Sequence, residues 1–111
     1  IWPKIENYKA DVKYMELAQL IGLNPKTPEE GVKMFADACE ELCVKVGVAT
    51  NVKSQGIDKA AWEESIHRIA MNAYEDQCTP ANPRMPIVKD MEEILRTIYD
   101  YESKFAPKDA K

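Results

Sequence analysis

Apolar residues recur at three- and four-residue spacing along most of the chain, which is the pattern of amphipathic helices. The clearest case follows Thr27-Pro28-Glu29-Glu30, whose hydroxyl, proline and glutamate have the order of a capping box at a helix start. The apolar stripe after it consists of Val32, Phe35, Cys39, Leu42 and Val46. We therefore predict a helix over about 28–46, ended by Gly47, with this stripe facing a core.

Three further segments carry the same periodicity. We predict helices over about 11–21, over about 59–72 with Asp58 as N-cap, and over about 88–103. The inner faces predicted for the last two helices are Trp62, Ile66, Ile69 and Ala73, and Ile87, Met91, Ile94, Leu95, Ile98 and Tyr101.

The segments between these helices do not change the fold class. Residues 1–10 are predicted to be an irregular lead-in, and 48–56 an extended start followed by one helical turn that Gly56 closes. Only a few residues within 44–52 alternate as a strand would. The charged, proline-containing residues 104–111 are predicted to be a frayed tail. We expect an all-α fold: an antiparallel-type bundle of four main helices plus a short helical turn, in a single segment over 1–111.

Composition excludes several classes of function. A chain of 111 residues forms one domain at most, and its net charge of −4 gives no basis for nucleic-acid binding. No apolar run approaches the roughly 20 residues that cross a membrane, and no signal segment opens the chain. Three cysteines make an odd number, which favours a reducing compartment, and we expect the cytoplasm.

A proline-rich loop over 74–86 separates the last two predicted helices. Its prolines at 80, 83 and 86 fix their own φ angles and keep the preceding residues extended, so an α-helix cannot run through it. The loop carries a carboxylate, a thiol, an amide and a guanidinium, on Asp76, Cys78, Asn82 and Arg84. We therefore interpret it as a loop with a defined conformation rather than a flexible linker.

The residues alone supply no active site. The single histidine, His67, is interpreted as a surface or boundary residue with Glu63 in reach, and Cys39 and Cys43 lack a second pair of metal ligands. Cys39 is predicted to be a core residue. Cys78 has no partner base that the sequence identifies. We predict no catalytic residue, no metal ligand and no cofactor-binding residue in this chain.

The segment from Glu75 to Arg84 closely resembles the aspartate, cysteine, threonine, asparagine-proline-arginine segment of iron-containing (group III) alcohol dehydrogenases. That family includes lactaldehyde reductases, propanediol and butanol dehydrogenases, and the alcohol-dehydrogenase half of aldehyde-alcohol dehydrogenases. The helix ending at Gly22-Leu23 and the segments Val46-Gly47-Val48 and Gln55-Gly56-Ile57 are similar to further landmarks of the family. Their order and spacing agree over about 10–101.

The resemblance implies a larger enzyme. Members have an amino-terminal dinucleotide-binding domain and a carboxyl-terminal helical domain of dehydroquinate-synthase-like architecture, with Fe²⁺, or sometimes Zn²⁺, bound between them, and NAD(P) as the hydride carrier. This chain is similar to the last part of that helical domain, and Ile1 in place of methionine fits a piece of a longer protein. The expected partners are the nucleotide-binding domain and upstream helices of the parent, and a further copy in a homo-oligomer. Alone, the segment is expected to be inactive.

The resemblance also assigns roles within the loop. Cys78 and Thr79 correspond to positions that line the substrate pocket, while Asn82, Pro83 and Arg84 match a motif that we interpret as structural. Two alternatives stay open. One is a free-standing, non-catalytic helical module that binds a partner protein. The other is a relative of glycerol dehydrogenases, to which the loop is less similar.

Overall fold

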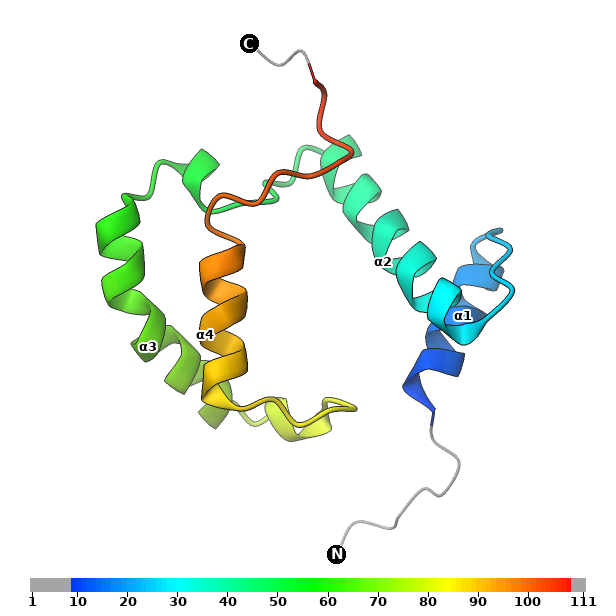
Figure 1. The fold of residues 1–111 in the computed structure, drawn as a ribbon, viewed down its shortest axis with the longest axis horizontal. Coiled ribbons are helices and arrows are strands. Elements are labelled where there is room, and N and C mark those ends of the chain that lie inside the picture. The colour runs from blue at the N-terminus through cyan, green and yellow to red at the C-terminus, as the bar shows by residue number, and fades with distance from the viewer. Residues whose placement is uncertain (1–8, 109–111) are drawn as a thin grey trace, which may run out of the picture. The chain divides into compact units, whose positions relative to one another are not determined.

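The computed structural model describes residues 9–108, and all regular secondary structure within them is helical. The elements are α1 (Ala10–Leu20), α2 (Pro28–Lys45), the 3-10 turn η1 (Lys53–Gln55), α3 (Lys59–Glu75), the 3-10 turn η2 (Thr79–Ala81) and α4 (Val88–Thr97) (Figure 1). No strand occurs in this part of the chain, including 44–52. The all-α prediction with four helices and a short turn closed by Gly56 is therefore confirmed, while the lead-in over 1–8 lies outside the described residues.

The helices fall into two compact units, which divide between Leu42 and Cys43. The first contains α1 and most of α2, and the second contains α3, α4 and the loops around them. That the whole chain forms a single domain stays a prediction.

In the first unit, α1 and α2 approach each other closely at a glycine. A Cβ added to Gly31 would lie 2.4 Å from the Met15 Cα, so only a residue without a side chain fits there. Beside this point the rings of Tyr14 and Phe35 pack with centroids 5.8 Å apart. Ala18 is fully buried. Backbone proximity and one aromatic pair thus join the two helices.

The ends of α2 follow the sequence signals closely. At its start the Glu30 N–H donates to Thr27 Oγ1 (3.2 Å), as the capping box requires. The Glu30 carboxylate accepts from the Lys26 N–H (2.6 Å), one residue before the expected partner. At its end Gly47 has a φ of +77°, a left-handed conformation that favours glycine and stops the helix.

In the second unit, α3 and α4 lie side by side and antiparallel (Figure 1). The indole N–H of half-buried Trp62 donates to Leu95 O (3.0 Å), and Ile66 and Ala70 are buried. The face predicted for α3 is corrected at one position, because Ala73 is exposed and Ala70 takes its place in the core. α3 also runs three residues beyond its predicted end at 72.

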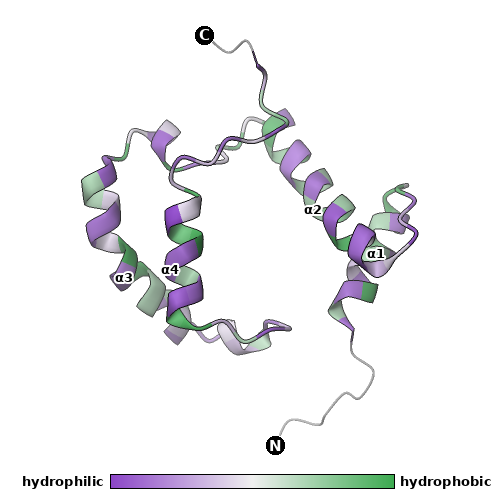
Figure 2. Ribbon diagram, viewed as in Figure 1, coloured by the Kyte–Doolittle hydropathy of each residue, from purple (hydrophilic) through white to green (hydrophobic). Residues whose placement is uncertain are grey.

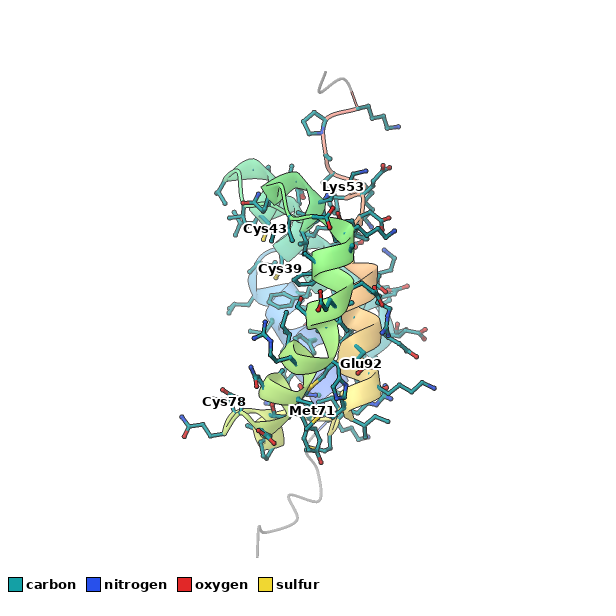
Figure 3. The ribbon with its side chains drawn as sticks, turned by 90° about the vertical axis from the view of Figure 1, so that its left-hand side faces the viewer. Cys39, Cys43, Lys53, Met71, Cys78 and Glu92 are labelled. Carbon is teal, nitrogen blue, oxygen red and sulfur yellow. The ribbon has the colours of Figure 1, made fainter. Side chains whose placement is uncertain are left out.

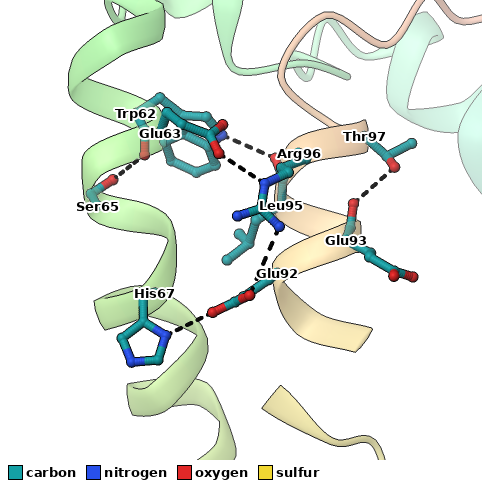
Figure 4. Close-up of polar contacts among 9 residues, drawn as sticks. All are labelled: Trp62, Glu63, Ser65, His67, Glu92, Glu93, Leu95, Arg96 and Thr97. Carbon is teal, nitrogen blue, oxygen red and sulfur yellow. Dashed lines mark hydrogen bonds and ion pairs between the residues drawn. The ribbon is translucent and has the colours of Figure 1, made fainter. Parts of the chain in front are cut away.

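Polar pairs continue this contact along both helices (Figure 4). Arg96 Nε donates to Glu63 Oε1 (2.8 Å), and His67 Nδ1 lies 2.7 Å from Glu92 Oε1. From the first pair to the second, the residue number rises on α3 and falls on α4, as an antiparallel arrangement requires. His67 therefore pairs across the helices with Glu92, and not within its own helix with Glu63 as the sequence suggested.

The predicted end of the last helix at 103 is wrong, because α4 ends six residues earlier. There the carbonyls of Ile98 and Tyr99 accept hydrogen bonds from Val52 N–H (3.2 Å) and Lys53 N–H (2.9 Å). The Tyr99 hydroxyl also donates to Ile57 O (2.9 Å). These contacts with a distant segment replace the hydrogen bonds that would continue the helix, and a short turn follows, in which Ala106 N–H donates to Ser103 O.

Much of the predicted apolar surface is exposed. On the α2 stripe Val32, Leu42 and Val46 are 38%, 58% and 65% exposed, and Cys39, predicted as core, is exposed as well. Ile87 and Ile94 are likewise exposed on the α4 side, where Figure 2 shows hydrophobic and hydrophilic residues alternating. The prediction that these residues face a core is therefore wrong for the described structure, because neither compact unit covers them by itself. No helix in this part is long and apolar enough to cross a membrane.

Candidate functional site

The loop that follows α3 begins with a sharp change of backbone direction. Asp76 is extended (φ −64°, ψ 136°), and its N–H donates to Ala73 O in the last turn of α3. The chain then forms the single turn η2, which contains Pro80. The prolines thus exclude an α-helix, as predicted, but they accommodate a 3-10 turn because proline lacks only a donor that such a turn leaves unused at its start.

Hydrogen bonds hold the first residues of this loop against the end of α3. The Cys78 N–H donates to Asp76 Oδ1 (2.8 Å), and the Thr79 N–H donates to Asp76 O (3.1 Å). The Thr79 hydroxyl reaches back to Ala73 O (2.5 Å). Four residues therefore form one connected set of contacts at the C-terminal end of α3.

Within this set Cys78 presents a free, exposed thiol, while Thr79 is half-buried. Figure 3 shows Cys78 in the loop beyond the end of α3. The one histidine of the chain, His67, pairs with Glu92, so it does not serve as a base for this thiol. The geometry supplies a shaped surface rather than a nucleophile with its base.

The second half of the loop contacts the start of α4. The Asn82 side-chain amide donates to Arg84 O, and the Arg84 guanidinium lies 3.9 Å from Asp90 Oδ2. Asp90 also accepts from the Ile87 N–H (3.1 Å), which caps α4. The roles predicted for Cys78, Thr79, Asn82, Pro83 and Arg84 stay predictions, but these contacts give the loop a defined conformation.

A groove of about 490 Å³ runs between this half of the loop and α4. Its lining includes Asn82, Arg84, Pro86, Asp90, Ile94 and Ile98. Neither Cys78 nor Thr79 contributes to it. The two halves of the loop therefore contribute to different surfaces: the first half is outside the groove, and the second half lines this groove of mixed polarity.

The residues of this part do not fit a metal ion. Among residues 9–108, no three histidine, cysteine or carboxylate side chains come together as ligands. A metal site needs such convergence.

The class of protein follows from a comparison with known families. Residues 2–99 match the C-terminal part of the Fe-containing alcohol dehydrogenase family. The chain belongs to this family. The match includes α1 to α4 and the whole proline-rich loop, so it covers both the fold and the candidate site.

Individual relatives agree with this assignment. The chain is 54% identical over 99 residues to aldehyde-alcohol dehydrogenase 2 of Entamoeba histolytica, covering 89% of this chain and 11% of that protein. It is 48% identical over 98 residues to the aldehyde-alcohol dehydrogenase of Streptococcus pneumoniae serotype 4, covering 88% and 11%. An NADPH-dependent butanol dehydrogenase of Clostridium saccharobutylicum is 30% identical over 87 residues, covering 78% and 22%. The chain thus spans only 11% of the length of the first two relatives.

Proposed function

We propose that this chain is the C-terminal part of the helical domain of a longer, metal-dependent, NAD(P)-linked alcohol dehydrogenase. The parent interconverts a small alcohol and its aldehyde. The observation that carries the proposal is the family match over residues 2–99. Two of the relatives are an aldehyde-alcohol dehydrogenase and an NADPH-dependent butanol dehydrogenase, which supports the reaction and the cofactor class.

The contribution of this segment is packing and one wall of the substrate cleft. Cys78 and Thr79 form the wall, and Asn82, Pro83 and Arg84 keep the loop in shape. The hydrogen bonds of Cys78 and Thr79 to the end of α3 support this assignment, because a wall that discriminates substrates must hold its side chains in fixed positions.

Fe²⁺ or Zn²⁺ and the nicotinamide belong to the rest of the parent. The absence of a three-ligand group among residues 9–108 supports that division. The exposed apolar residues of α2 and α4 are the surface on which the upstream helices of the parent pack. We place the parent in the cytoplasm, since all three cysteines carry free thiols, and we expect a homo-oligomer.

The experiment that tests the cleft wall is Cys78→Trp in the full-length enzyme. The indole would fill the space beside the thiol, so we expect KM for the alcohol to rise at least about tenfold or turnover to be lost. Steady-state kinetics with metal content measured in parallel check this. Glu64→Trp, an equally large change at an exposed position on α3, serves as the control and should leave KM unchanged.

Intact mass in the source distinguishes the parent enzyme from a free-standing interaction module. An antibody to the loop over 78–86 should detect a band several times heavier than 12.6 kDa. Detection of the 12.6 kDa chain alone would contradict the proposal in favour of the module that binds a partner protein.

A further inference from the structure

We propose that Asp76 is a positioning residue for the cleft wall, acting through the backbone of Cys78 and Thr79. This inference rests on the proposed function, because it concerns the same wall. Asp76 does not itself line the groove between the loop and α4. Its effect on substrate binding would pass through the two residues that it holds.

The contacts of Asp76 determine where the loop leaves α3. Its N–H donates to Ala73 O (3.3 Å), its side-chain Oδ1 accepts from Cys78 N–H (2.8 Å), and its carbonyl accepts from Thr79 N–H (3.1 Å). The Thr79 hydroxyl donates to the same Ala73 carbonyl. Asp76 thus contacts both the end of the helix and the two residues of the wall.

The position of the prolines explains why this residue has such influence. Pro80, Pro83 and Pro86 restrict the backbone after the wall, and each also restricts the residue before it. Residues 76–78 have no such restriction, so their conformation depends on hydrogen bonds. Because the later part of the loop is stiff, a change at its first residues would move Cys78 and Thr79 together.

The hydrogen bond to Cys78 limits which side chains can replace that of Asp76. The Cys78 N–H needs an acceptor two residues earlier, which aspartate and asparagine both supply and alanine does not. A negative charge is not required by this contact. Asp76→Asn should therefore keep this hydrogen bond, and Asp76→Ala should remove it while the two main-chain bonds of residue 76 remain.

The test uses the full-length enzyme with two independent readouts. In Asp76→Ala we expect KM for the alcohol to rise about three- to tenfold with kcat within twofold of wild type. We also expect the alkylation rate of Cys78, followed by peptide mapping after iodoacetamide treatment, to change at least threefold. Asp76→Asn should restore both values to within twofold of wild type.

A matched control comes from the other end of α3. Asp58 Oδ2 accepts from the Ala61 N–H (3.1 Å), so Asp58→Ala removes the same kind of hydrogen bond without touching the loop. It should lower the melting temperature about as much as Asp76→Ala, yet leave KM and Cys78 alkylation unchanged. If Asp58→Ala changed KM and Cys78 alkylation as much as Asp76→Ala does, a general loss of stability would explain both effects. That result would overturn the positioning role.

The outcomes separate this inference from the proposed function. Unchanged Cys78 alkylation in Asp76→Ala, or an Asp76→Asn variant as impaired as Asp76→Ala, overturns the positioning role even if Cys78→Trp blocks the cleft. Altered alkylation in Asp76→Ala supports control of the loop by Asp76. If KM then stays at the wild-type value in both Asp76→Ala and Cys78→Trp, the loop is not part of the cleft, and the cleft-wall role in the proposed function fails together with the positioning role.

Discussion

Gly31 lies in the first turn of α2, where the sequence signals of a helix start give no reason for a glycine. The structure supplies the reason, because the Met15 backbone of α1 occupies the space that a side chain would need. The absence of a Cβ is thus a packing requirement and not a break in the helix. Only the contact with a second helix reveals it.

Gly31→Ala should destabilise the chain by about 1–3 kcal/mol, because the added methyl would lie 2.4 Å from the Met15 Cα and 2.5 Å from its Cβ. The clash thus outweighs the roughly 1 kcal/mol that alanine otherwise gains over glycine inside a helix, and the net effect is destabilising. Urea unfolding followed by circular dichroism measures the change. The double variant Gly31→Ala with Met15→Ala should not recover stability, since the clash is with backbone. An unchanged midpoint for Gly31→Ala would refute the close approach.

At the scale of elements, the hairpin of α3 and α4 depends on contacts that differ in burial. The Trp62 indole donates to the Leu95 carbonyl at a half-buried position. The Arg96–Glu63 pair is about half exposed on both sides. The pKa of Arg96 is raised above its ordinary value, first of all by its hydrogen bond to Glu63. Its charge therefore does not change in the neutral pH range, and water weakens what the pair contributes.

Trp62→Phe should therefore destabilise the hairpin by roughly 1–3 kcal/mol, because the Leu95 carbonyl loses its indole donor and the smaller ring leaves space. The measurement is again the free energy of unfolding from urea titration. Glu63→Gln, which removes only the exposed ion pair, serves as the matched control and should have the smaller effect. The opposite order would mean that surface charges, and not the indole, hold α3 to α4.

At the scale of the whole molecule, the most informative feature is apolar surface that neither compact unit covers by itself. Val32, Leu42 and Val46 follow helical periodicity, yet each is more than a third exposed. The apolar face of a helix is normally buried in the folded protein, and burying one such side chain contributes roughly 1.5–3 kcal/mol to stability. The exposed stripe is what the proposed packing against a larger enzyme would bury.

Cys39 lies on this stripe and serves as a reporter of that packing. In the 111-residue chain its exposed thiol should react rapidly with a maleimide. In the proposed full-length parent enzyme, upstream helices should cover it and slow the reaction at least tenfold. Peptide mapping after timed labelling provides the rates. Equal rates in the two proteins would show that the α2 stripe is not the surface that the parent covers.

How far the sequence predicted the structure can be seen at particular residues. Helix boundaries that local chemistry sets are confirmed, because each depends on atoms within a few residues. They are marked by the Thr27 hydroxyl, the Asp58 cap and the left-handed glycines 47 and 56. The end of α4 is not confirmed, because Tyr99 and Ile98 bond to a segment more than 40 residues away. In the candidate site, the loop motif was visible in the sequence, but the contact from Asp76 to Cys78 was not.

The sequence by itself determined the all-helical fold, the starts of its helices and the family to which the chain belongs. These follow from periodicity, caps and an ordered motif, all of which are local along the chain. Only the tertiary structure decided that His67 pairs with Glu92, that Gly31 admits the Met15 backbone, and that Cys39 is exposed. Those outcomes depend on which elements meet in space, and helical periodicity specifies a face to be buried without specifying what buries it.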